Sequence, residues 1–523
     1  MSKLNILVAE DKKNWQSALE SILKGLGNEV TVEIAPDYPT ALRQIKNVKY
    51  DLVTIDLKLP SAYPVSDNTD LSGMELMREL HTGSHNQGCG LIVLTAYPTL
   101  ARTKEAFLKY GAFDFIEKQD FDNREFLDKA RAAILDARLK YAVTRMQKRF
   151  KFTITFNDES LLGGKMTGPS RGTEYVARNP KRLDVSDLIR RADSLNLHLL
   201  NGDVERWRRE AKSIGNAIYK TLADDQHILQ DLRMAQVLPE QAKDFWLEFS
   251  GPATVLGIPF ELLREGEDYL CLRHTLTRRL AQEGVISRNP DPFHTFIQRL
   301  QQNGETFRLL IVGSNSDGSI PGAEDEAREL ARIIDSDLQT LGIPHEITSL
   351  IGEDATYNNV RHALSRGGYH VFHYAGHGRY MDTLPEISEL ILLDNGAPKV
   401  LSAADLNLIV QDSDLQFVFL SCCVGARSAV QLGRGAFFGP IEALTRASIL
   451  IEELTRAEIP SVLIYRWTVA DTSALLLAES FYESLWHTFS PGQALLEARL
   501  NVATMAQPDD YHWASPVLVT QND

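Results

Sequence analysis

Residues 3–122 alternate short apolar runs with segments of helical periodicity. The apolar runs are rich in β-branched residues, as strands are: LNILVAE, VTVEIA, DLVTIDL, GLIVLTA and FDFIE. The segments between them, such as WQSALESILKGLG and PTALRQIKNV, repeat apolar residues at helical spacing. Strands that alternate with helices predict an α/β domain with a doubly wound parallel sheet.

The same alternation returns after Glu305. FRLLIVGSNS, HEITSLIG, YHVFHYAGHG, LQFVFLSCC and SVLIYRWTV are the strand candidates, with helical segments between them. This pattern predicts a second α/β domain, again built on a parallel sheet. The region between the two domains mixes short strands with helices, so we expect a mixed α+β arrangement there.

One long helix is predicted from Asn123 to Phe150, in NREFLDKARAAILDARLKYAVTRMQKRF. Its apolar positions at i, i+3 and i+4 spacing are Phe126, Ala130, Ile134, Ala137 and Tyr141. We expect this helix to connect the two halves of the chain. Pairing with a second copy through this helix is a further expectation, although the pattern holds fewer than about three heptads.

Size and pattern together divide the chain into four segments. A chain of 523 residues is too long to fold around a single hydrophobic core, so more than one domain is expected. The predicted segments are a first domain (1–122), the connector helix (123–150), an accessory region (151–305) and the second α/β domain (306–523).

The composition narrows the partners and the compartment. The net charge of −15 disfavours nucleic acid or an anionic membrane surface as partner. No apolar run approaches the roughly 18 residues of a membrane span, and the start MSKLNILVAED reads as a strand rather than a signal peptide. Four cysteines are too few for a disulfide framework. We therefore expect a cytoplasmic protein with free thiols.

Polar side chains end several strands of the first domain. Glu10 and Asp11 follow the first strand, Asp56 ends the third, Thr95 ends the fourth and Lys118 follows the fifth. Ligands bind at the carboxyl ends of strands in a doubly wound sheet, so we expect these side chains to converge. Three carboxylates form a hard-oxygen site suited to Mg²⁺. A lysine and a hydroxyl beside them would orient a phosphoryl group, which predicts an aspartyl phosphate.

These residues and the pattern GAFDFIEK resemble the receiver domain of response regulators, over about residues 3–122. The resemblance implies a flavodoxin-like fold and a sensor histidine kinase as partner. It also assigns roles: Asp56 as phosphoacceptor, Mg²⁺ ligands at Glu10, Asp11, Asp56 and the carbonyl of Lys58, phosphate contacts at Thr95 and Lys118, and an aromatic switch at Phe115.

The sequence departs from the receiver pattern at two places. Gln119 stands where receivers usually have proline after the lysine. The loop after Asp56 is lengthened by SAYPVSDNTD. The geometry beside the phosphorylation site is therefore expected to differ from that of a standard receiver.

Two strands of the second domain end in reactive side chains, His377 and Cys423. They lie 46 positions apart, close to the spacing of about 50 residues in caspases. A thiolate attacks a peptide carbonyl, and an imidazole exchanges the protons. Cys423 taken alone would read as a small buried hydrophobe. A zinc site of His373 and His377 is not expected, because the segment is a strand without a third ligand.

The motifs HYAGHG and FLSCC resemble the CHAT family of caspase-like peptidases. The resemblance covers about residues 150–523, most clearly 230–523, where IPFELL also matches. It implies a caspase-like α/β fold, the dyad His377 and Cys423, and Cys422 in the place of the family's usual alanine. The acid that metacaspases carry two residues before the nucleophile is absent, because Ser421 stands there.

The segment VLIYRWTVAD resembles the strand of this family that ends at the specificity pocket, which places Trp467 and Asp471 beside it. A carboxylate there would favour cleavage after Arg or Lys. The alternative is that Asp471 is the N-cap of the helix that follows, TSALLLAESF.

The sequence predicts a phosphorylation-regulated cysteine endopeptidase of a two-component pathway that cleaves a protein partner. Mg²⁺ is the expected cofactor of the receiver, and none is expected for the peptidase. The alternative is a non-catalytic, receiver-controlled module that binds proteins on a degenerate caspase-like fold. Retention of both Cys423 and His377 favours the enzyme.

Overall fold

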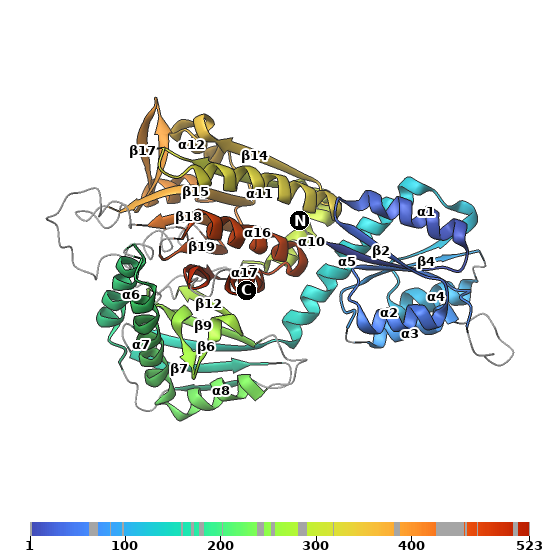
Figure 1. Cartoon of the computed structure of the whole chain (residues 1–523), viewed down its shortest axis with the longest axis horizontal. Helices are drawn as coiled ribbons and strands as arrows, with labels where there is room; N and C mark the ends of the chain where they lie inside the picture. The colour runs from blue at the N-terminus through green and yellow to red at the C-terminus, as the bar shows by residue number, and fades with distance from the viewer. Residues whose placement is uncertain are drawn as a thin grey trace. The chain divides into compact units, whose positions relative to one another are not determined.

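We describe a computed structural model of the chain (Figure 1). It describes residues 3–61, 72–83, 85–96, 99–157, 160–168, 172–176, 182–200, 202–237, 245–252, 257–280, 290–316, 318–380, 388–424, 454, 458–467, 469–505 and 511–521. The chain forms two compact units. The N-terminal unit is Met1–Thr144 with the segments Ile333–Pro344 and Trp486–Phe489, and the C-terminal unit comprises the remaining residues.

The N-terminal unit contains a five-stranded parallel sheet of order β2-β1-β3-β4-β5, which confirms the predicted flavodoxin-like fold. Its strands are β1 (Leu4–Ala9), β2 (Val30–Ala35), β3 (Leu52–Asp56), β4 (Gly90–Thr95) and β5 (Asp114–Glu117). The helices are α1 (Lys13–Leu23), α2 (Tyr38–Asn47), α3 (Ser72–Thr82), α4 (Leu100–Tyr110) and α5 (Asn123–Lys148). Residues of α2, α3 and α4 share one core cluster with the strands, and α1 covers the other face (Figure 1). Strands β3 and β4 are buried on both faces because helices lie on both sides.

The predicted connector is one continuous helix, α5, of 26 residues, but it ends at Lys148, and Phe150, which was expected to end the helix, begins strand β6 instead. Phe126, Ala130 and Ile134 are buried, as the apolar pattern indicated, whereas Ala137 and Tyr141 are half-buried. The division between the two units falls within this helix, between Thr144 and Arg145.

The C-terminal unit contains a large, mainly parallel sheet, which agrees with the predicted caspase-like α/β fold. Among the described residues its order is β14-β13-β15-β18-β19-β20-β12-β9-β6-β7-β8, and the hairpin β16–β17 pairs with β15. The strands are β6 (Phe150–Asn157), β7 (Ser160–Thr167), β8 (Thr173–Val176), β9 (Phe245–Gly251), β12 (Thr275–Leu280), β13 (Phe307–Ser314), β14 (His345–Ile351), β15 (Val371–Tyr380), β16 (Ser388–Asp394), β17 (Ala397–Ser402), β18 (Phe417–Val424), β19 (Ser461–Tyr465) and β20 (Pro516–Thr520). A separate two-stranded sheet pairs β10 (Arg264–Glu265) with β11 (Asp268–Tyr269).

Strands from the accessory region and from the second α/β domain belong to this one sheet. Among the described residues, the helices that lie wholly or mostly in this unit are α6 (Val185–Leu200), α7 (Val204–Ala223), α8 (Gln226–Val237), α10 (Phe293–Asn303), α11 (Pro321–Thr340), α12 (Tyr357–Arg366), α13 (Ala403–Val410), α16 (Asp471–Thr488) and α17 (Pro491–Met505). Strands β13, β15, β18 and β19 run parallel, so their carboxyl ends meet at one edge. No helix in the described part of the chain has the length and apolar character needed to cross a bilayer.

Candidate functional sites at two sheet edges

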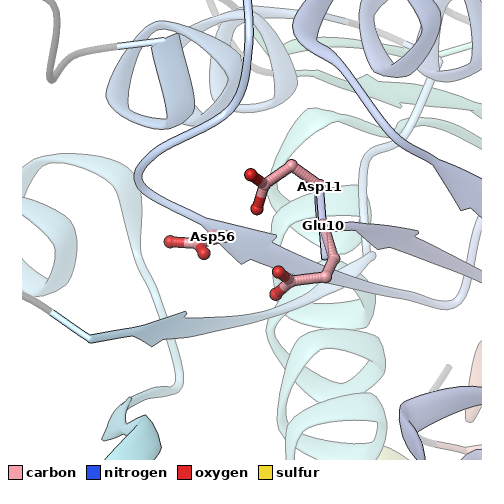
Figure 2. Close-up of side chains that lie close together, drawn as sticks. All are labelled: Glu10, Asp11 and Asp56. Atoms are coloured by element: carbon pink, nitrogen blue, oxygen red, sulfur yellow. The ribbon is translucent and has the colours of Figure 1, made fainter. Parts of the chain in front are cut away.

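Three carboxylates lie together at the carboxyl edge of the N-terminal sheet (Figure 2). Asp56 is the last residue of β3, and Glu10 and Asp11 directly follow β1. One oxygen of each lies within 4.8 Å of the others. Glu10 is 1% and Asp56 6% exposed, whereas Asp11 is exposed to solvent. Two buried carboxylates and one solvent-exposed carboxylate therefore form a cluster of hard oxygen ligands.

Lys118 joins the two buried acids. Its Nζ lies 2.5 Å from Glu10 Oε2 and 2.5 Å from Asp56 Oδ2. The ammonium group also lies 5.3 Å from the centre of the Trp15 ring, which covers it from α1. Burial raises the pKa of Glu10, while its hydrogen bond to Lys118 acts in the opposite direction. The lysine therefore offsets part of the cost of holding carboxylates out of water.

Backbone groups fix the orientation of both buried carboxylates. The amide of Lys58 donates to Asp56 Oδ1 over 3.1 Å, and the amide of Lys12 donates to Glu10 Oε1 over 3.1 Å. Gly73, in the first turn of α3, passes so close to the end of β3 that a Cβ there would lie 2.5 Å from the Asp56 carbonyl oxygen. Sequence reasoning missed this role of Gly73, although a glycine that opens a helix after the phosphoacceptor loop was the available signal.

The other predicted receiver residues lie on the neighbouring strands. Thr95 is the fully buried last residue of β4, and Phe115 of β5 is half-buried against the core. Lys118 and Gln119 begin a short 3₁₀ helix, Lys118–Asp120. Residues 62–71, which include most of the lengthened loop, lie outside the described residues.

In the C-terminal unit, His377 on β15 pairs in parallel register with Cys423 on β18. The strands are direct neighbours, and their backbones are therefore about 4.8 Å apart. Residues Val418, Leu420 and Cys422 of β18 belong to one core cluster. Cys422 is 1% exposed. The side chain of Cys423 lies outside what the structure describes, so its predicted role rests here on backbone register.

Hydrogen bonds hold both the ring and the main chain of His377. Its Nε2 lies 2.8 Å from Ser319 Oγ, in the loop between β13 and α11. The Tyr374 hydroxyl lies 2.9 Å from the His377 carbonyl oxygen and 2.8 Å from that of Ile391. A Cβ at Gly376 would lie 2.5 Å from the Tyr374 hydroxyl oxygen. The first glycine of AGHG therefore makes room for the tyrosine that holds the histidine.

His373 lies in the core, where it makes two polar contacts. Its Nε2 is 3.1 Å from Glu326 Oε1 on α11, and its Nδ1 is 3.2 Å from the Tyr482 hydroxyl on α16. All three side chains are buried, with exposures of 0% for His373 and 3% for Glu326. These contacts give His373 a structural explanation as a hydrogen-bonded core residue.

The two residues predicted beside a specificity pocket differ in exposure. Trp467 is 2% exposed, and its indole nitrogen donates to the Ala192 carbonyl oxygen over 3.1 Å. Asp471 is exposed in the first turn of α16. A Cβ at Gly322, near the start of α11, would lie 2.5 Å from Asp471 Oδ2. Asp471 therefore stands where two helices begin, near the loop that carries Ser319.

Comparison with known families identifies both units. The CHAT domain matches residues 212–521, and the response regulator receiver domain matches residues 6–131. The chain belongs to the CHAT family, which is a family of caspase-like peptidases, and carries a receiver domain fused to it. The resemblances inferred from the sequence are thereby confirmed.

Two curated relatives are similar to this chain over part of their length. Residues of this chain are 31% identical over 116 positions to the aerobic respiration control sensor protein ArcB of Escherichia coli, covering 22% of this chain and 13% of the sensor. A protein-glutamate methylesterase/protein-glutamine glutaminase of Myxococcus xanthus is 26% identical over 133 residues, which are 25% of this chain and 35% of that protein. The chain thus spans a minor part of each relative.

Two solved structures are also similar to this chain. A CheY-like receiver domain protein from Methanospirillum hungatei is 26% identical, covers 27% of this chain and 99% of its own, and has a TM-score of 0.23. The receiver domain of a sensor histidine kinase from Pseudomonas aeruginosa, solved with magnesium in its active-site cleft, is 26% identical, covers 25% and 98%, and has a TM-score of 0.21.

Proposed function

We propose that the protein is a cysteine endopeptidase regulated by phosphorylation of its receiver domain. A sensor histidine kinase phosphorylates Asp56, and the CHAT domain cleaves a protein partner with His377 and Cys423. The observation that carries the peptidase assignment is the direct register of His377 with Cys423 on adjacent parallel strands. The division into receiver (1–122), connector (123–150), accessory region (151–305) and peptidase domain (306–523) is part of the proposal.

In the receiver, an Asp56 carboxylate oxygen attacks the phosphorus of a phosphohistidine. The new O–P bond forms as the P–N bond breaks, and the imidazole of the kinase, protonated on its other ring nitrogen, leaves as the neutral ring. Lys118, 2.5 Å from Asp56 Oδ2, is placed to neutralise charge on the phosphoryl oxygens. Thr95, at the end of the neighbouring strand β4, is the proposed hydroxyl contact.

The donor set fits a divalent cation, because three carboxylates reach within 4.8 Å of one another and one is open to solvent. Glu10, Asp11, Asp56 and the carbonyl of Lys58 would hold Mg²⁺, which supplies positive charge for the phosphoryl oxygens. The ammonium group of Lys118 already supplies positive charge at this site, and it therefore reduces the mutual repulsion of the carboxylates.

In the peptidase, the Cys423 sulfur attacks the scissile carbonyl carbon while His377 carries the thiol proton to the leaving amine. Water then hydrolyses the thioester and regenerates the thiol. Strand alternation supports Cys423 over Cys422 as nucleophile. Cys422 belongs to the core set with Val418 and Leu420, and position 423 belongs to the alternate set of β18.

The coupling route proposed here runs through α5. Arg138 of α5 is buried, and its guanidinium lies 2.7 Å from Asp51 Oδ1, directly before β3. The strand that begins beside this ion pair ends at Asp56. Gly90 at the start of β4 also touches α5, because a Cβ there would lie 2.9 Å from the Ala133 carbonyl oxygen. A repacking of β3 and β4 after phosphorylation would therefore act on α5 directly, with Phe115 as the proposed switch residue.

Asp471 is the proposed determinant of a preference for Arg or Lys before the cleaved bond. Its exposure supports this role, since a substrate cation can reach only a carboxylate that solvent also reaches. The competing role is stabilisation of the first turn of α16, where an acid interacts well with the helix dipole. Asp471→Asn is expected to reduce discrimination between basic and apolar substrates in a peptide library.

Covalent labelling tests the peptidase assignment. The full chain is treated with peptidyl acyloxymethyl ketones that carry either basic or apolar residues next to the reactive group, and the modified residue is identified by mass spectrometry. Wild type is expected to be modified at Cys423. Cys423→Ala and His377→Ala are expected to lose labelling, and Cys422→Ala, the matched control, is expected to retain it.

Labelling of Cys422, or labelling that persists in Cys423→Ala, would refute the assignment of the nucleophile. Absence of labelling in a folded wild-type protein, with and without a phosphoryl mimic at Asp56, would favour the non-catalytic binding module instead.

A further inference from the structure

The Nε2 atom of His377 lies 2.8 Å from a hydroxyl oxygen that belongs to another strand connection. Ser319 lies after β13, within the loop that ends where α11 begins at Pro321. The contact joins residues 58 positions apart in sequence. Because β13 and β15 are neighbouring parallel strands, the loop after β13 reaches the same edge of the sheet as His377.

The loop that carries Ser319 is held by its own hydrogen bonds. Asn315 accepts at Oδ1 from the Ile320 amide over 2.9 Å, and its carbonyl accepts from the Gly318 amide over 3.1 Å. Gly318 has a φ of +74°, a conformation that favours glycine. Ser319 therefore sits between two braced positions of a tight turn.

The first residue before the loop, Ser314, shares an acceptor on β16 with Tyr374, whose hydroxyl also contacts the main chain of His377. Ser314 Oγ donates to the Ile391 carbonyl oxygen over 3.0 Å, and the Tyr374 hydroxyl, which contacts the His377 carbonyl, lies 2.8 Å from the same oxygen. One carbonyl of β16 thus connects the base of the Ser319 loop with the backbone of His377. These contacts fix the Ser319 loop and the backbone of His377 relative to each other.

We propose that Ser319 is a positioning residue for His377, an inference that rests on the proposed peptidase function. Ser319 Oγ accepts the Nε2 proton of the imidazole, which selects the tautomer with Nδ1 unprotonated. Nδ1 then exchanges the proton with the Cys423 thiol. When His377 becomes an imidazolium, the Nε2–H···Oγ bond becomes charge-assisted and stabilises that state.

Removing the Ser319 hydroxyl is expected to have two effects that the loss of a purely structural serine would not have. Loss of the hydroxyl lowers the fraction of His377 in the reactive tautomer, so the rate of the chemical step falls while substrate binding is preserved. It also removes a partner of the imidazolium, so His377 releases its proton at lower pH. The acid limb of the pH profile, which reports protonation of the resting neutral imidazole, moves to lower pH.

The experiment compares four full-length proteins: wild type, Ser319→Ala, Ser319→Thr and Ser316→Ala. Ser316→Ala is the matched control, because Ser316 lies in the same loop, is buried, and its Oγ has no hydrogen-bond partner among the described residues. The readouts are the pH profile of electrophile labelling at Cys423, the separate kcat and KM values on a cleaved peptide, and the ¹⁵N chemical shifts of His377, assigned by comparison with His377→Gln.

Ser319→Ala is expected to lower kcat about ten-fold with KM little changed, as the loss of one hydrogen bond to a charged group implies. Its acid limb shifts to lower pH, Ser319→Thr recovers most of the rate, and Ser316→Ala behaves as wild type. The His377 nitrogen shifts change from the Nε2-protonated pattern to a tautomer mixture in Ser319→Ala.

Two results would overturn the inference. One is wild-type rates and an unshifted pH profile in Ser319→Ala while labelling still depends on Cys423; the proposed function would then stand without this positioning residue. The other is a set of His377 nitrogen shifts that does not change between wild type and Ser319→Ala. A wild type that no electrophile labels would instead refute the peptidase itself, and the two failures are therefore distinguishable.

Discussion

The two sheet edges of this protein are built on different physical principles. At the receiver edge, opposite charges do the positioning: Lys118 binds two buried carboxylates, Glu10 and Asp56, at 2.5 Å each. At the CHAT edge, neighbouring strands align His377 with Cys423, and neutral hydroxyls of Ser319 and Tyr374 hold the histidine.

The difference matches what each edge is proposed to do. A site that rests on buried charges changes its balance when a phosphoryl group adds negative charge, so it is suited to act as a switch. A site that rests on strand register keeps its geometry under the same change, because backbone pairing does not depend on ionisation. The receiver edge should therefore be sensitive to charge, and the CHAT edge should be sensitive to the loss of hydroxyl groups.

The largest expected effect comes from removing the central cation of the receiver. Lys118→Met leaves Glu10 and Asp56 buried without their partner, which costs about 3–5 kcal/mol for a buried pair. Hydrogen-exchange mass spectrometry of peptides from β3 and β4, in chelator, measures the loss. Added Mg²⁺ is expected to restore protection in part, because a cation would again oppose the acids.

Lys109→Met provides the control for Lys118, because its ion pair with Glu105 is exposed. It should leave exchange in β3 and β4 unchanged. Equal protection in Lys118→Met and Lys109→Met would mean that charge does not organise the receiver edge.

An effect of intermediate size concerns acid stability of the C-terminal unit away from its candidate site. Burial at the amino edge of the sheet lowers the pKa of His370 to about 4, helped by Arg308 and opposed by Asp414. Above its ordinary pKa of 6.5 the ring is neutral in both states, and below it only the unfolded chain takes the proton. Stability is therefore lost as pH falls from about 6.5 towards 4, by about 3 kcal/mol in total.

Urea denaturation followed by tryptophan fluorescence, between pH 7 and 4, measures this loss. His370→Asn keeps an acceptor for the Arg308 amide, which now donates to His370 Nδ1 over 3.1 Å, and should flatten the pH dependence. The exposed His362→Asn variant should retain it. Identical acid profiles for the two variants would remove His370 as the cause.

The smallest expected effect is at the CHAT edge. Tyr374→Phe removes the hydroxyl that contacts the His377 and Ile391 carbonyls and should cost about 1 kcal/mol. Labelling of Cys423 should also slow, because the backbone of His377 is less fixed. Tyr369→Phe loses a hydrogen bond to Thr348, 3.0 Å long and distant from His377, and should cost stability without slowing the labelling. If both variants slowed labelling equally, the effect would come from general loosening of the unit.

Much of this architecture follows from local patterns in the sequence. The parallel strands appear as apolar runs, and the residues at their carboxyl ends must meet at one edge, so Asp56 with Glu10, and His377 with Cys423, were predictable as pairs. What escaped prediction depends on contacts between distant segments. Ser319 contacts His377 although the two residues are 58 positions apart, and no spacing in the sequence predicts this contact.

The accessory region illustrates the same limit on a larger scale. Its strands β6, β9 and β12 read as isolated short strands, because a strand pattern does not state which neighbour it will pair with. In the structure β12 pairs with β20 and β9, so residues from the middle of the chain extend the sheet of the second α/β domain. Similarly, Trp467 was predicted beside a pocket, and its burial against Ala192 depends on α6, which is distant in sequence.

We propose that phosphorylation of Asp56 sets the reactivity of Cys423. The most direct test is the labelling rate of Cys423 in the full chain, with and without Mg²⁺ and beryllofluoride as phosphoryl mimic, in wild type and Asp56→Asn. We expect the mimic to change the labelling rate in wild type and to leave the rate of Asp56→Asn unchanged. One and the same rate for wild type, mimic-bound protein and Asp56→Asn would contradict it and leave the receiver as a docking module.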